Sequence, residues 1–338
     1  MLRWLHSPPM SHYDLYAIGN ALVDTEYEVS DEQLGAMGVD KRHMTLIDTP
    51  RRAELLGQLK AHHPRRTGGG SAGNTVVALS QLGGRAFYSC SVADDELGDF
   101  YAADLQANGV ATNLTHTRAR EGQTGSCLVL VTPDAERSMC TFLGVSADLN
   151  DSALHPEDIA KSRLYYMEGY LAASPTGLQA ALAGKATALA QGVPLALTLS
   201  DVSMIRFCKA GLDAMLDGGV DFLFCNEEEA QVWTGLSDID AVASAMAPLA
   251  KTVCITRGPQ GCLIVQGSER HTVATVPVKA VDTNGAGDMF AGAFLYGVSQ
   301  GWPLTQAATL ANRCAAAVVS QHGNRLTRAQ MQELLQAR

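Results

Sequence analysis

Short apolar segments alternate with amphipathic helical patterns along most of the chain. Residues 13–19, YDLYAIG, form an apolar run typical of a strand, and residues 73–84, GNTVVALSQLGG, have helical spacing and end in two glycines. Further strand candidates lie at residues 85–93, 162–169, 193–200, 220–225 and 251–256. Further helix candidates lie at residues 95–110, 175–192, 204–219 and 227–235. This alternation predicts an α/β protein, a three-layer α/β/α sandwich with a mostly parallel central sheet.

Two regions depart from this alternation. Residues 22–48 and 111–145 look like irregular β ribbon, and residues 124–144 are typical of a hairpin with its turn near Pro133 and Asp134. We expect these two insertions to form a small β lid over the mouth of an active site. Residues 10–338 then make up a single domain, and residues 1–9 are an N-terminal tail ahead of the first strand.

Composition and charge exclude several classes of protein. The chain has 338 residues, of which 46% are hydrophobic and 18% charged, as in a globular protein. Its 25 basic and 35 acidic residues give a net charge of −10, which disfavours nucleic acid as a partner. No segment approaches the roughly 18 apolar residues of a membrane span. We therefore expect a cytoplasmic protein that does not enter a membrane.

Cysteine and histidine spacing gives no sign of a transition-metal site. The eight cysteines contain no CxxC pair and several lie in apolar runs, so we expect them to be buried, reduced thiols. The nine histidines include no HExxH or HxH spacing. We therefore do not expect a dedicated transition-metal site.

The segment VDTNGAGDMF at residues 281–290 places two carboxylates around a run of small residues. The valine-rich residues 271–282 before it are a strand candidate, and apolar residues after it recur at helical spacing, so residues 284–287 begin a helix. The first amides of a helix lack partners, and small side chains let an anion approach them. Asp288 would lie beside that anion, where a carboxylate is useful as a base for a hydroxyl.

A simple helix cap is the alternative interpretation of this segment, because Asp282 and Asn284 could satisfy the free amides themselves. Two other kinds of nucleotide site are disfavoured. No GxxxxGK[ST] motif occurs, so the protein is not a P-loop enzyme. No GxGxxG motif follows the first strand, which argues against a Rossmann dinucleotide site.

Two further polar elements are candidates for ligand binding. Residues 68–80 begin with three glycines and carry Asn74 into a helix, which could form a wall for a polyhydroxy ligand with Asn74 as donor and acceptor. Asp24 follows the first strand, at the sheet edge where ligands of α/β proteins bind, and could hold two vicinal hydroxyls. The alternatives are a loop with a helix cap for the first and a solvated turn acid for Asp24.

The segments GGGSAGN at residues 68–74 and DTNGAGDMFAGAF at residues 282–294 resemble the two signatures of the ribokinase-like (PfkB) carbohydrate kinase family. The resemblance extends from about Asp14 to the C-terminus and includes NEEEA at 226–230 and TRGPQG at 256–261. It implies a ribokinase-like fold and ATP-dependent phosphoryl transfer to an alcohol, with Asp288 as the base. The implied anion hole consists of Asn284, Gly285, Ala286 and Gly287.

The resemblance also implies a nucleotide site and its ions. Asn226 and Glu229 match the NxxE motif, which organises Mg²⁺ and its waters. Many members bind a monovalent cation such as K⁺, for which Asp282, Asn284 and residues 321–327 are candidates. The implied ATP contacts are Arg137, in the lid, and Asn226, Thr256, Arg257, Gly258, Gly261, Asn312 and Gly323.

Within the family, the chain resembles the adenosine kinase branch, notably over residues 19–24 and 29–48. This implies that the acceptor is the 5′-hydroxyl of adenosine or a related nucleoside. The implied acceptor contacts are Asn20, Asp24, Gly69, Gly70, Ser71, Asn74, Cys127 and Tyr170, with His43 or Met44 from the lid. Tyr170 would stack on the base or be a core tyrosine.

Other functions remain open at this point. A sugar kinase acting on ribose, fructose or 2-keto-3-deoxygluconate is the first alternative, and a non-catalytic ligand-binding relative is the second. The protein is expected to be a monomer or a homodimer joined through the lid.

Overall fold

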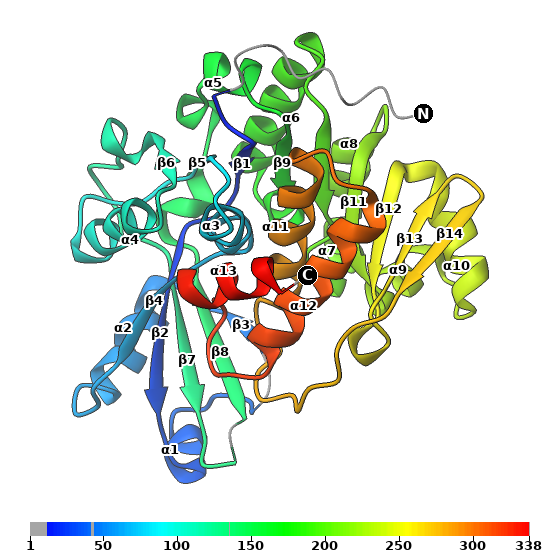
Figure 1. The fold of residues 1–338 in the computed structure, drawn as a ribbon. Coiled ribbons are helices and arrows are strands. Elements are labelled where there is room, and N and C mark those ends of the chain that lie inside the picture. The colour runs from blue at the N-terminus through cyan, green and yellow to red at the C-terminus, as the bar shows by residue number, and fades with distance from the viewer. Residues whose placement is uncertain (1–11, 42–43, 135, 338) are drawn as a thin grey trace.

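The computed structural model describes residues 12–41, 44–134 and 136–337, so the predicted tail and His43 lie outside the described residues. Its centre is a nine-stranded sheet with the order β14-β13-β12-β11-β10-β9-β1-β5-β6 (Figure 1). The strands are β1 (Leu15–Ile18), β5 (Ala86–Ser89), β6 (Ala111–Thr112), β9 (Tyr165–Glu168), β10 (Leu195–Thr198), β11 (Val220–Asn226), β12 (Ala250–Thr256), β13 (Cys262–Gln266) and β14 (Glu269–Val273). Neighbours from β6 to β12 are parallel, and only β13 and β14 join antiparallel. The predicted mostly parallel sheet is confirmed.

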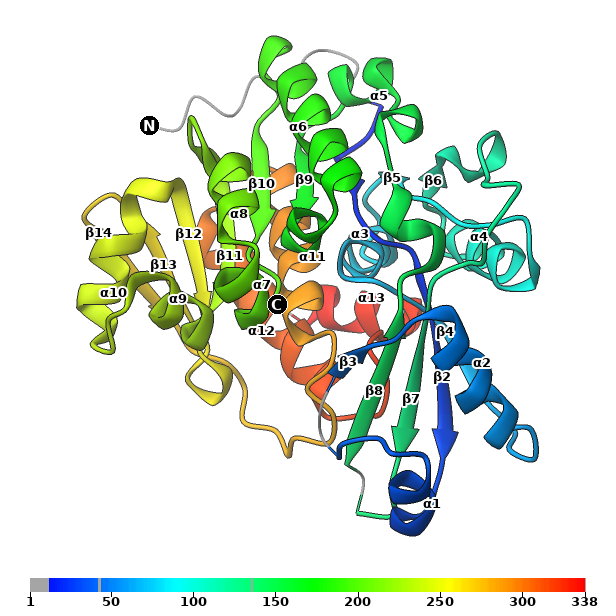
Figure 2. The same cartoon turned by 180° about the vertical axis from the view of Figure 1, so that it is seen from behind.

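Helices cover both faces of this sheet (Figures 1 and 2). One face carries α3 (Ser71–Gln81), α4 (Glu96–Ala107), α11 (Ala286–Ser299), α12 (Leu304–Val319) and α13 (Arg328–Gln336). The other carries α5 (Pro156–Ala160), α6 (Pro175–Ala190), α7 (Val202–Phe207), α8 (Lys209–Leu216), α9 (Glu227–Thr234) and α10 (Ile239–Met246). Successive strand residues enter opposite apolar cores, as Tyr165 and Tyr166 of β9 do. The central strands are therefore largely apolar, whereas the edge strand β14 is polar and mostly exposed, and the three-layer sandwich is confirmed.

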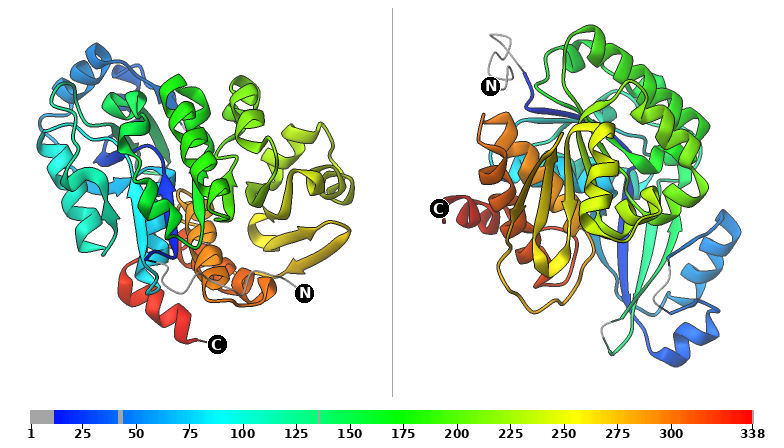
Figure 3. Two further views of the ribbon diagram at one scale, coloured as in Figure 1. Left: turned by 90° about the horizontal axis from the view of Figure 1, so that it is seen from above. Right: turned by 90° about the vertical axis from the view of Figure 1, so that its right-hand side faces the viewer.

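A second, five-stranded sheet projects from one end of the sandwich as a lid (Figures 1 and 3). Its order is β3-β8-β7-β2-β4, from β2 (Leu22–Glu28), β3 (Met44–Leu46), β4 (Arg65–Gly69), β7 (Ser126–Val131) and β8 (Arg137–Phe142). Helices α1 (Asp31–Ala36) and α2 (Thr49–Gln58) cover one face and bury residues such as Tyr27 and Leu130. The opposite face carries Asp24, Glu26 and Arg137, and we call it the inner face.

Strand alternation explains why the lid has one apolar core and one polar face. Along β2 the residues Val23, Thr25 and Tyr27 are buried, whereas Asp24 and Glu26 between them are partly exposed. Paired residues lie on the same face of a sheet, so the register places Cys127 beside Asp24, and Val129 beside Glu26. The lid thus presents a mixed polar and apolar surface on its inner face.

Three predicted boundaries require correction. Strand β4 completes the lid but lies outside both predicted insertions, because its glycines and arginines lack a strand pattern. Strand β6 lies inside the second predicted insertion but pairs with β5 in the large sheet. The predicted strand at 271–282 ends at Val273, and the segment that follows contains Pro277, which has no N–H for a ladder.

Two predictions from composition can be compared with the described residues. All eight cysteines are free thiols, and all except Cys208 are buried. Among the described helices, none has the length and apolar character needed to cross a membrane.

The packing of α11 against α3 positions the segment that contains Asp288. Gly292 lies one turn after Asp288, and a Cβ atom there would overlap the Thr75 carbonyl oxygen of α3. The two helix backbones therefore approach closely only because residue 292 is glycine. This contact fixes how far the N-terminus of α11 lies from the N-terminus of α3.

We predict that Gly292→Ala lowers the free energy of unfolding by about 1–3 kcal/mol, because the methyl group meets backbone that cannot move aside easily. Gly57→Ala in α2 is the matched control, since a Cβ there meets nothing within 4 Å. The control should be neutral or stabilising by up to about 1 kcal/mol through helix propensity. Urea unfolding followed by circular dichroism measures both. Equal stability of the two variants would contradict the close-packing account.

Candidate active site

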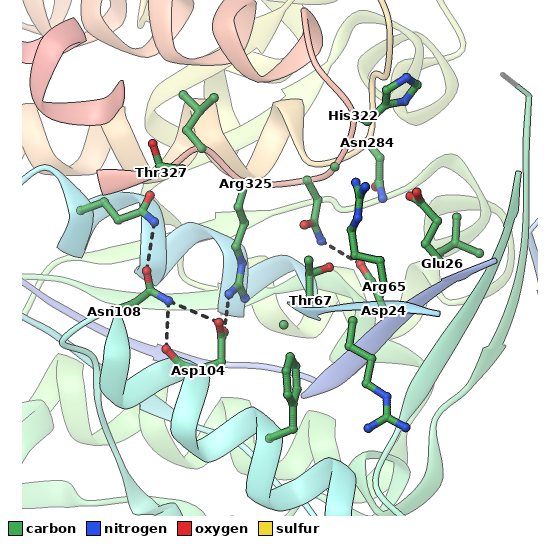
Figure 4. A pocket seen from close by; sticks show the side chains of 18 of the residues that line it. Asp24, Glu26, Arg65, Thr67, Asp104, Asn108, Asn284, His322, Arg325 and Thr327 are labelled. Carbon is green, nitrogen blue, oxygen red and sulfur yellow. Dashed lines mark hydrogen bonds and ion pairs between the residues drawn. The ribbon is translucent and has the colours of Figure 1, made fainter. Parts of the chain in front are cut away.

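The candidate site lies where the inner face of the lid meets the carboxyl ends of β1 and β9 and the N-termini of α3 and α11. This is the edge at which open α/β sheets bind ligands. A cavity of about 390 Å³ opens beside this junction, and Figure 4 shows its lining residues, which include Asp24, Asn284 and Arg325. Residues far apart in the sequence therefore converge at one opening. Asp288, Ser71 and Asn74 are not among the residues that line it.

Asp288 is the third residue of α11 and is half-buried. Ser71 Oγ donates to Asp288 Oδ1 at 2.7 Å, and Asn74 Nδ2 donates to Asp288 Oδ2 at 2.9 Å. Burial raises the pKa of Asp288 to about 6, although these two hydrogen bonds and the positive charge of Arg325 oppose the rise. The structure thus holds a carboxylate in a fixed orientation with a pKa suited to accepting a proton near neutral pH.

The N-terminus of α11 is open to an anion. Its N-cap is Gly285, at φ 76°, and no side chain caps the helix. The carboxylate of Asp282 accepts instead from the N–H of Asn284, before the helix, at 3.1 Å. A simple side-chain cap is therefore excluded for this helix. The N–H of Ala286 donates to the Thr283 carbonyl oxygen at 3.4 Å, whereas Gly287 and Asp288 precede the first intrahelical hydrogen bond, from Met289 to Gly285, and Gly287 is exposed.

Asp282 joins this loop to two other elements. Its Oδ2 accepts from the N–H of Gly323 at 2.9 Å and pairs with Arg137 Nη1 of the lid at 2.9 Å. Arg137 Nη2 also pairs with Glu26 Oε2 at 2.9 Å. The Arg137 and Asp282 side chains are only 13% and 4% exposed, so water screens their attraction weakly. Arg137 thus fastens the lid to the anion site, and a monovalent cation on Asp282 would have to compete with this guanidinium.

Asp24 lies on the lid and faces the body. Its Oδ2 accepts from Asn324 Nδ2 at 2.7 Å, and burial raises its pKa to about 7 despite the nearby Arg325 and Arg137. A Cβ at Gly69 would come within 2.5 Å of Asp24 Oδ1, so glycine is required opposite this carboxylate. Gly70 has φ 84°, and a side chain there would overlap the Asn20 carbonyl oxygen. The glycine run therefore admits both the carboxylate and the loop after β1.

Glu168 is a site residue that the sequence interpretation missed. It is 1% exposed at the end of β9, and it accepts the N–H of Asn20 at 2.7 Å and the N–H of Ala72 at 2.8 Å. Burial raises its pKa to about 8. One carboxyl group thus joins the loop after β1 to the first turn of α3. A charged residue ending the apolar run LYYME was the available signal.

Asn324 and Arg325 were also missed as individual residues, although the loop that carries them had been singled out. Asn324 contacts Asp24, and Arg325 contacts Asn74. Nothing in the local sequence GNRL distinguishes these contacts, because both partners belong to distant elements.

The predicted acceptor residues are brought together only in part. Ser71 and Asn74 meet at Asp288, Asp24 lines the neighbouring cavity, and Asn20 contacts Glu168 through its backbone N–H. Cys127 is buried beside Asp24, and burial raises its thiol pKa above the ordinary value. Tyr170 is half-buried near the acidic groups of Asp201 and Asp288, and burial raises its pKa well above the ordinary value. Met44 on β3 is 41% exposed.

The NxxE segment forms a closed capping box at the start of α9. Asn226 Oδ1 accepts the N–H of Glu229 at 2.8 Å, and Asn226 Nδ2 donates to Glu229 Oε1 at 2.6 Å. Burial raises the pKa of Glu229 to about 7, with the charges of Asp201, Glu228 and Asp288 adding to the rise. Gathered negative charge of this kind suits a hydrated divalent cation such as Mg²⁺. The described residues contain no group of three His, Cys, Asp or Glu side chains placed to bind a metal directly.

The remaining predicted nucleotide residues follow β11 and β12. Thr256 ends β12, Arg257 Nε pairs with Glu227 Oε2 at 3.3 Å, and Gly258 has φ 53°. Gly261, at φ 83°, lies directly against the Val273 carbonyl oxygen. These residues form a tight turn at the sheet edge next to the NxxE segment, and their contact with ATP stays a prediction.

Asn312 lies in α12 and contacts the chain that leaves β14. Its side chain is buried, and Nδ2 donates to the carbonyl oxygens of Val273 at 2.8 Å and Ala274 at 3.3 Å. The amide therefore supports the chain that leaves β14. Its predicted contact with ATP stays a prediction.

We predict that Glu168→Ala lowers the free energy of unfolding by about 3 kcal/mol, because two buried N–H groups lose their acceptor. Glu168→Gln keeps one acceptor oxygen and should lose about half as much. Glu96→Gln is the control, since its carboxylate is 80% exposed in its pair with Arg66. Urea unfolding at pH 7 measures all three. The assignment fails if Glu168→Ala is as stable as the control.

Similarity to known proteins extends along nearly the whole chain. The profile of the pfkB family carbohydrate kinases matches residues 40–330. The crystal structure of adenosine kinase from Sinorhizobium meliloti is 35% identical, covers 96% of this chain and 99% of its own, and superposes with a TM-score of 0.85. The structure of a probable sugar kinase from Rhizobium etli is 33% identical with the same coverage and TM-score.

A third relative extends the comparison beyond bacteria. The adenosine kinase of Schizophyllum commune is 28% identical over 347 aligned residues, which cover 93% of this chain and 97% of the relative. The match to the family profile spans most of the chain, and it includes the segments that form the anion site and the glycine run. The chain therefore belongs to the pfkB family of carbohydrate kinases.

Proposed function

We propose that the protein is an ATP-dependent kinase that phosphorylates a primary hydroxyl, the 5′-hydroxyl of adenosine or of a related nucleoside. The observation that carries the proposal is the pairing of Asp288 with an uncapped helix N-terminus. A carboxylate held by Ser71 and Asn74 lies directly beside amides that are free to bind an anion. Phosphoryl transfer requires this combination, since it depends on positioning and charge stabilisation.

In the proposed reaction, Asp288 accepts the proton of the acceptor hydroxyl as its oxygen bonds to the γ-phosphorus of ATP. The bond from that phosphorus to the β–γ bridging oxygen breaks, and ADP leaves with the electron pair. The amides of residues 285–288 lie where negative charge accumulates on the transferred group. Ser71 and Asn74 hold the carboxylate so that a free lone pair can meet the hydroxyl. The lid covers the site, which limits transfer to water.

Magnesium fits the residues at the start of α9. Glu229, with Asn226, would hold Mg²⁺ through water molecules, and the ion supplies neutralisation of phosphate charge when bound. The supporting observation is the raised pKa of Glu229 among Asp201, Glu228 and Asp288. Arg137 would contribute a further positive charge from the lid.

A nucleoside acceptor is supported by the inner face of the lid. Asp24 offers a carboxylate for vicinal ribose hydroxyls. Beyond it, the register aligns Val129 with Met139, and Met139 with Met44 on the edge strand. Met44 and Leu46 are 41% and 60% exposed, which leaves apolar surface of the kind that a nucleobase covers. A free sugar offers nothing to bury there.

A sugar acceptor is the alternative, and it is supported by the similarity to the probable sugar kinase from Rhizobium etli. Asp24, Asn74 and the glycine run would bind hydroxyls of a hexose or ribose equally well. A nucleoside kinase and a sugar kinase would carry out the same phosphoryl transfer. They differ in whether the acceptor covers the apolar surface of the lid.

Two further properties are part of the proposal. A potassium ion near Asp282 is proposed by family resemblance, at a carboxylate that already pairs with Arg137. A homodimer through the lid is compatible with the described edge of β3, which pairs on one side with β8 alone. Both stay predictions.

We predict ATP consumption with adenosine but not with ribose in a screen of nucleosides and sugars at equal concentration. Coupled detection of ADP measures it, and Asp288→Asn enzyme gives the background. Turnover of ribose or fructose without adenosine would replace the nucleoside assignment with a sugar kinase. Absence of turnover with every acceptor would contradict the kinase itself.

We predict that Asp288→Asn lowers kcat by roughly 100- to 10,000-fold, because the isosteric amide cannot accept the hydroxyl proton. The Kd of the acceptor, measured by calorimetry, should stay close to that of the wild type. Asp213→Asn is the control, since Asp213 pairs with Lys209 on the surface of α8. Near-normal turnover of the Asp288 variant would show that another group is the base.

A further inference from the structure

Arg325 lies between α12 and α13, and its side chain points toward Asp104 (Figure 4). Its Nε donates to Asn74 Oδ1 at 2.8 Å, and its Nη1 pairs with Asp104 Oδ2 of α4 at 2.5 Å. The side chain is 10% exposed, and Asn74 is 5% exposed. An acid on α4, a guanidinium and an amide thus form a nearly dry chain that ends at Asp288.

The chemistry of a guanidinium fixes the orientation of this amide. Arginine donates hydrogen bonds and accepts none, so Asn74 must turn its oxygen toward Arg325. Its NH₂ group then necessarily faces Asp288, to which it donates at 2.9 Å. Without Arg325, the amide could rotate and place its oxygen against the carboxylate, where two acceptors repel.

The backbone around this chain leaves room for it. A Cβ at Gly68 would overlap Asp104 Oδ2 and would lie 2.8 Å from Arg325 Nη1. Gly68 therefore clears the path of the ion pair, as Gly69 and Gly70 clear that of Asp24 and Asn20. The first glycine of the run has a role that lies outside ligand contact.

We propose that Arg325, anchored by Asp104, is a positioning residue that orients Asn74 and thereby the carboxylate of Asp288. The inference rests on the proposed function for its catalytic consequence, but not for the orientation itself. It assigns to the loop after α12 a role in the acceptor half of the site.

The charges around Asp288 explain why a cation matters at this position. The acidic groups that interact electrostatically with Asp288 are Asp24, Tyr166, Glu168, Tyr170 and Glu229. Arg325 opposes them and lowers the pKa of both Asp288 and Asp24. Arg137 acts on Asp24 from the lid. Loss of Arg325 therefore removes positive charge and amide orientation together, and both losses raise the pKa of Asp288.

The test compares the wild type with Arg325→Met, Arg325→Lys and Asp104→Asn. The Asp288 carboxyl is titrated by ¹³C NMR without substrate, and the pH dependence of kcat is measured with both substrates saturating.

Arg325→Met should raise the Asp288 pKa by about one unit or more and shift the acid limb of the kcat profile in the same direction. It should also lower the plateau kcat by roughly tenfold or more. Lysine restores the positive charge but lacks the planar guanidinium that binds Asn74 and Asp104 together. Arg325→Lys should therefore restore the pKa of Asp288 more fully than it restores the maximal kcat. Asp104→Asn should have an Asp288 pKa and a maximal kcat between those of the wild type and Arg325→Met.

Arg118→Met is the matched control, because Arg118 pairs with the exposed Asp99 on α4, the helix that carries Asp104, and does not line the cavity. It should leave the titration and the rate unchanged. The proposal would be overturned if a folded Arg325→Met protein had an unchanged Asp288 pKa, even if its maximal kcat were lower. If Arg325→Met does not fold, Arg325→Lys and Asp104→Asn decide by the same criteria. The NMR titration needs no turnover, so its result is separable from failure of the kinase assignment.

Discussion

The hydrogen bonds from Ser71 and Asn74 to Asp288 are the contact on which the rest of the site depends. They exist because α11 lies tightly against α3, which a glycine at position 292 permits. The same packing brings the free amides of one helix beside the acceptor residues of another. The packing of the two helices thus places a carboxylate beside an open helix N-terminus, which is the arrangement that the proposed phosphoryl transfer uses.

Burial of charge is the second constraint. The pKa values of Asp24, Glu168, Glu229 and Asp288 are all raised by burial, so ionising this group of acids costs free energy. Arg137 and Arg325 offset part of that cost from opposite sides, one on the lid and one after α12. Arg137 also joins the lid to the loop that precedes α11 through Asp282. The polar network therefore links substrate access, carboxylate ionisation and helix geometry.

Local pattern predicted the elements of the body and the position of Asp288 well. Apolar runs bounded by turns identify parallel strands, and small residues before helical spacing identify an open helix N-terminus. The missed features depend on distant partners. Strand β4 forms because it pairs with β2, although its own sequence has no strand pattern. Glu168 accepts hydrogen bonds from amides 148 and 96 residues away. Asn312 donates to the carbonyl oxygen that ends β14. Arg325 reaches Asn74 across 251 residues, which no local pattern encodes.

The pH dependence of kcat/KM for the preferred acceptor, which reports ionisation before the acceptor binds, tests the central claim most directly. Asp288 must be deprotonated to accept the hydroxyl proton, and its raised pKa of about 6 keeps it protonated at lower pH. The value of kcat/KM should therefore be constant above about pH 7 and fall about tenfold per unit below pH 6. A kcat/KM that stays constant down to pH 5 would contradict the role of Asp288 as the base.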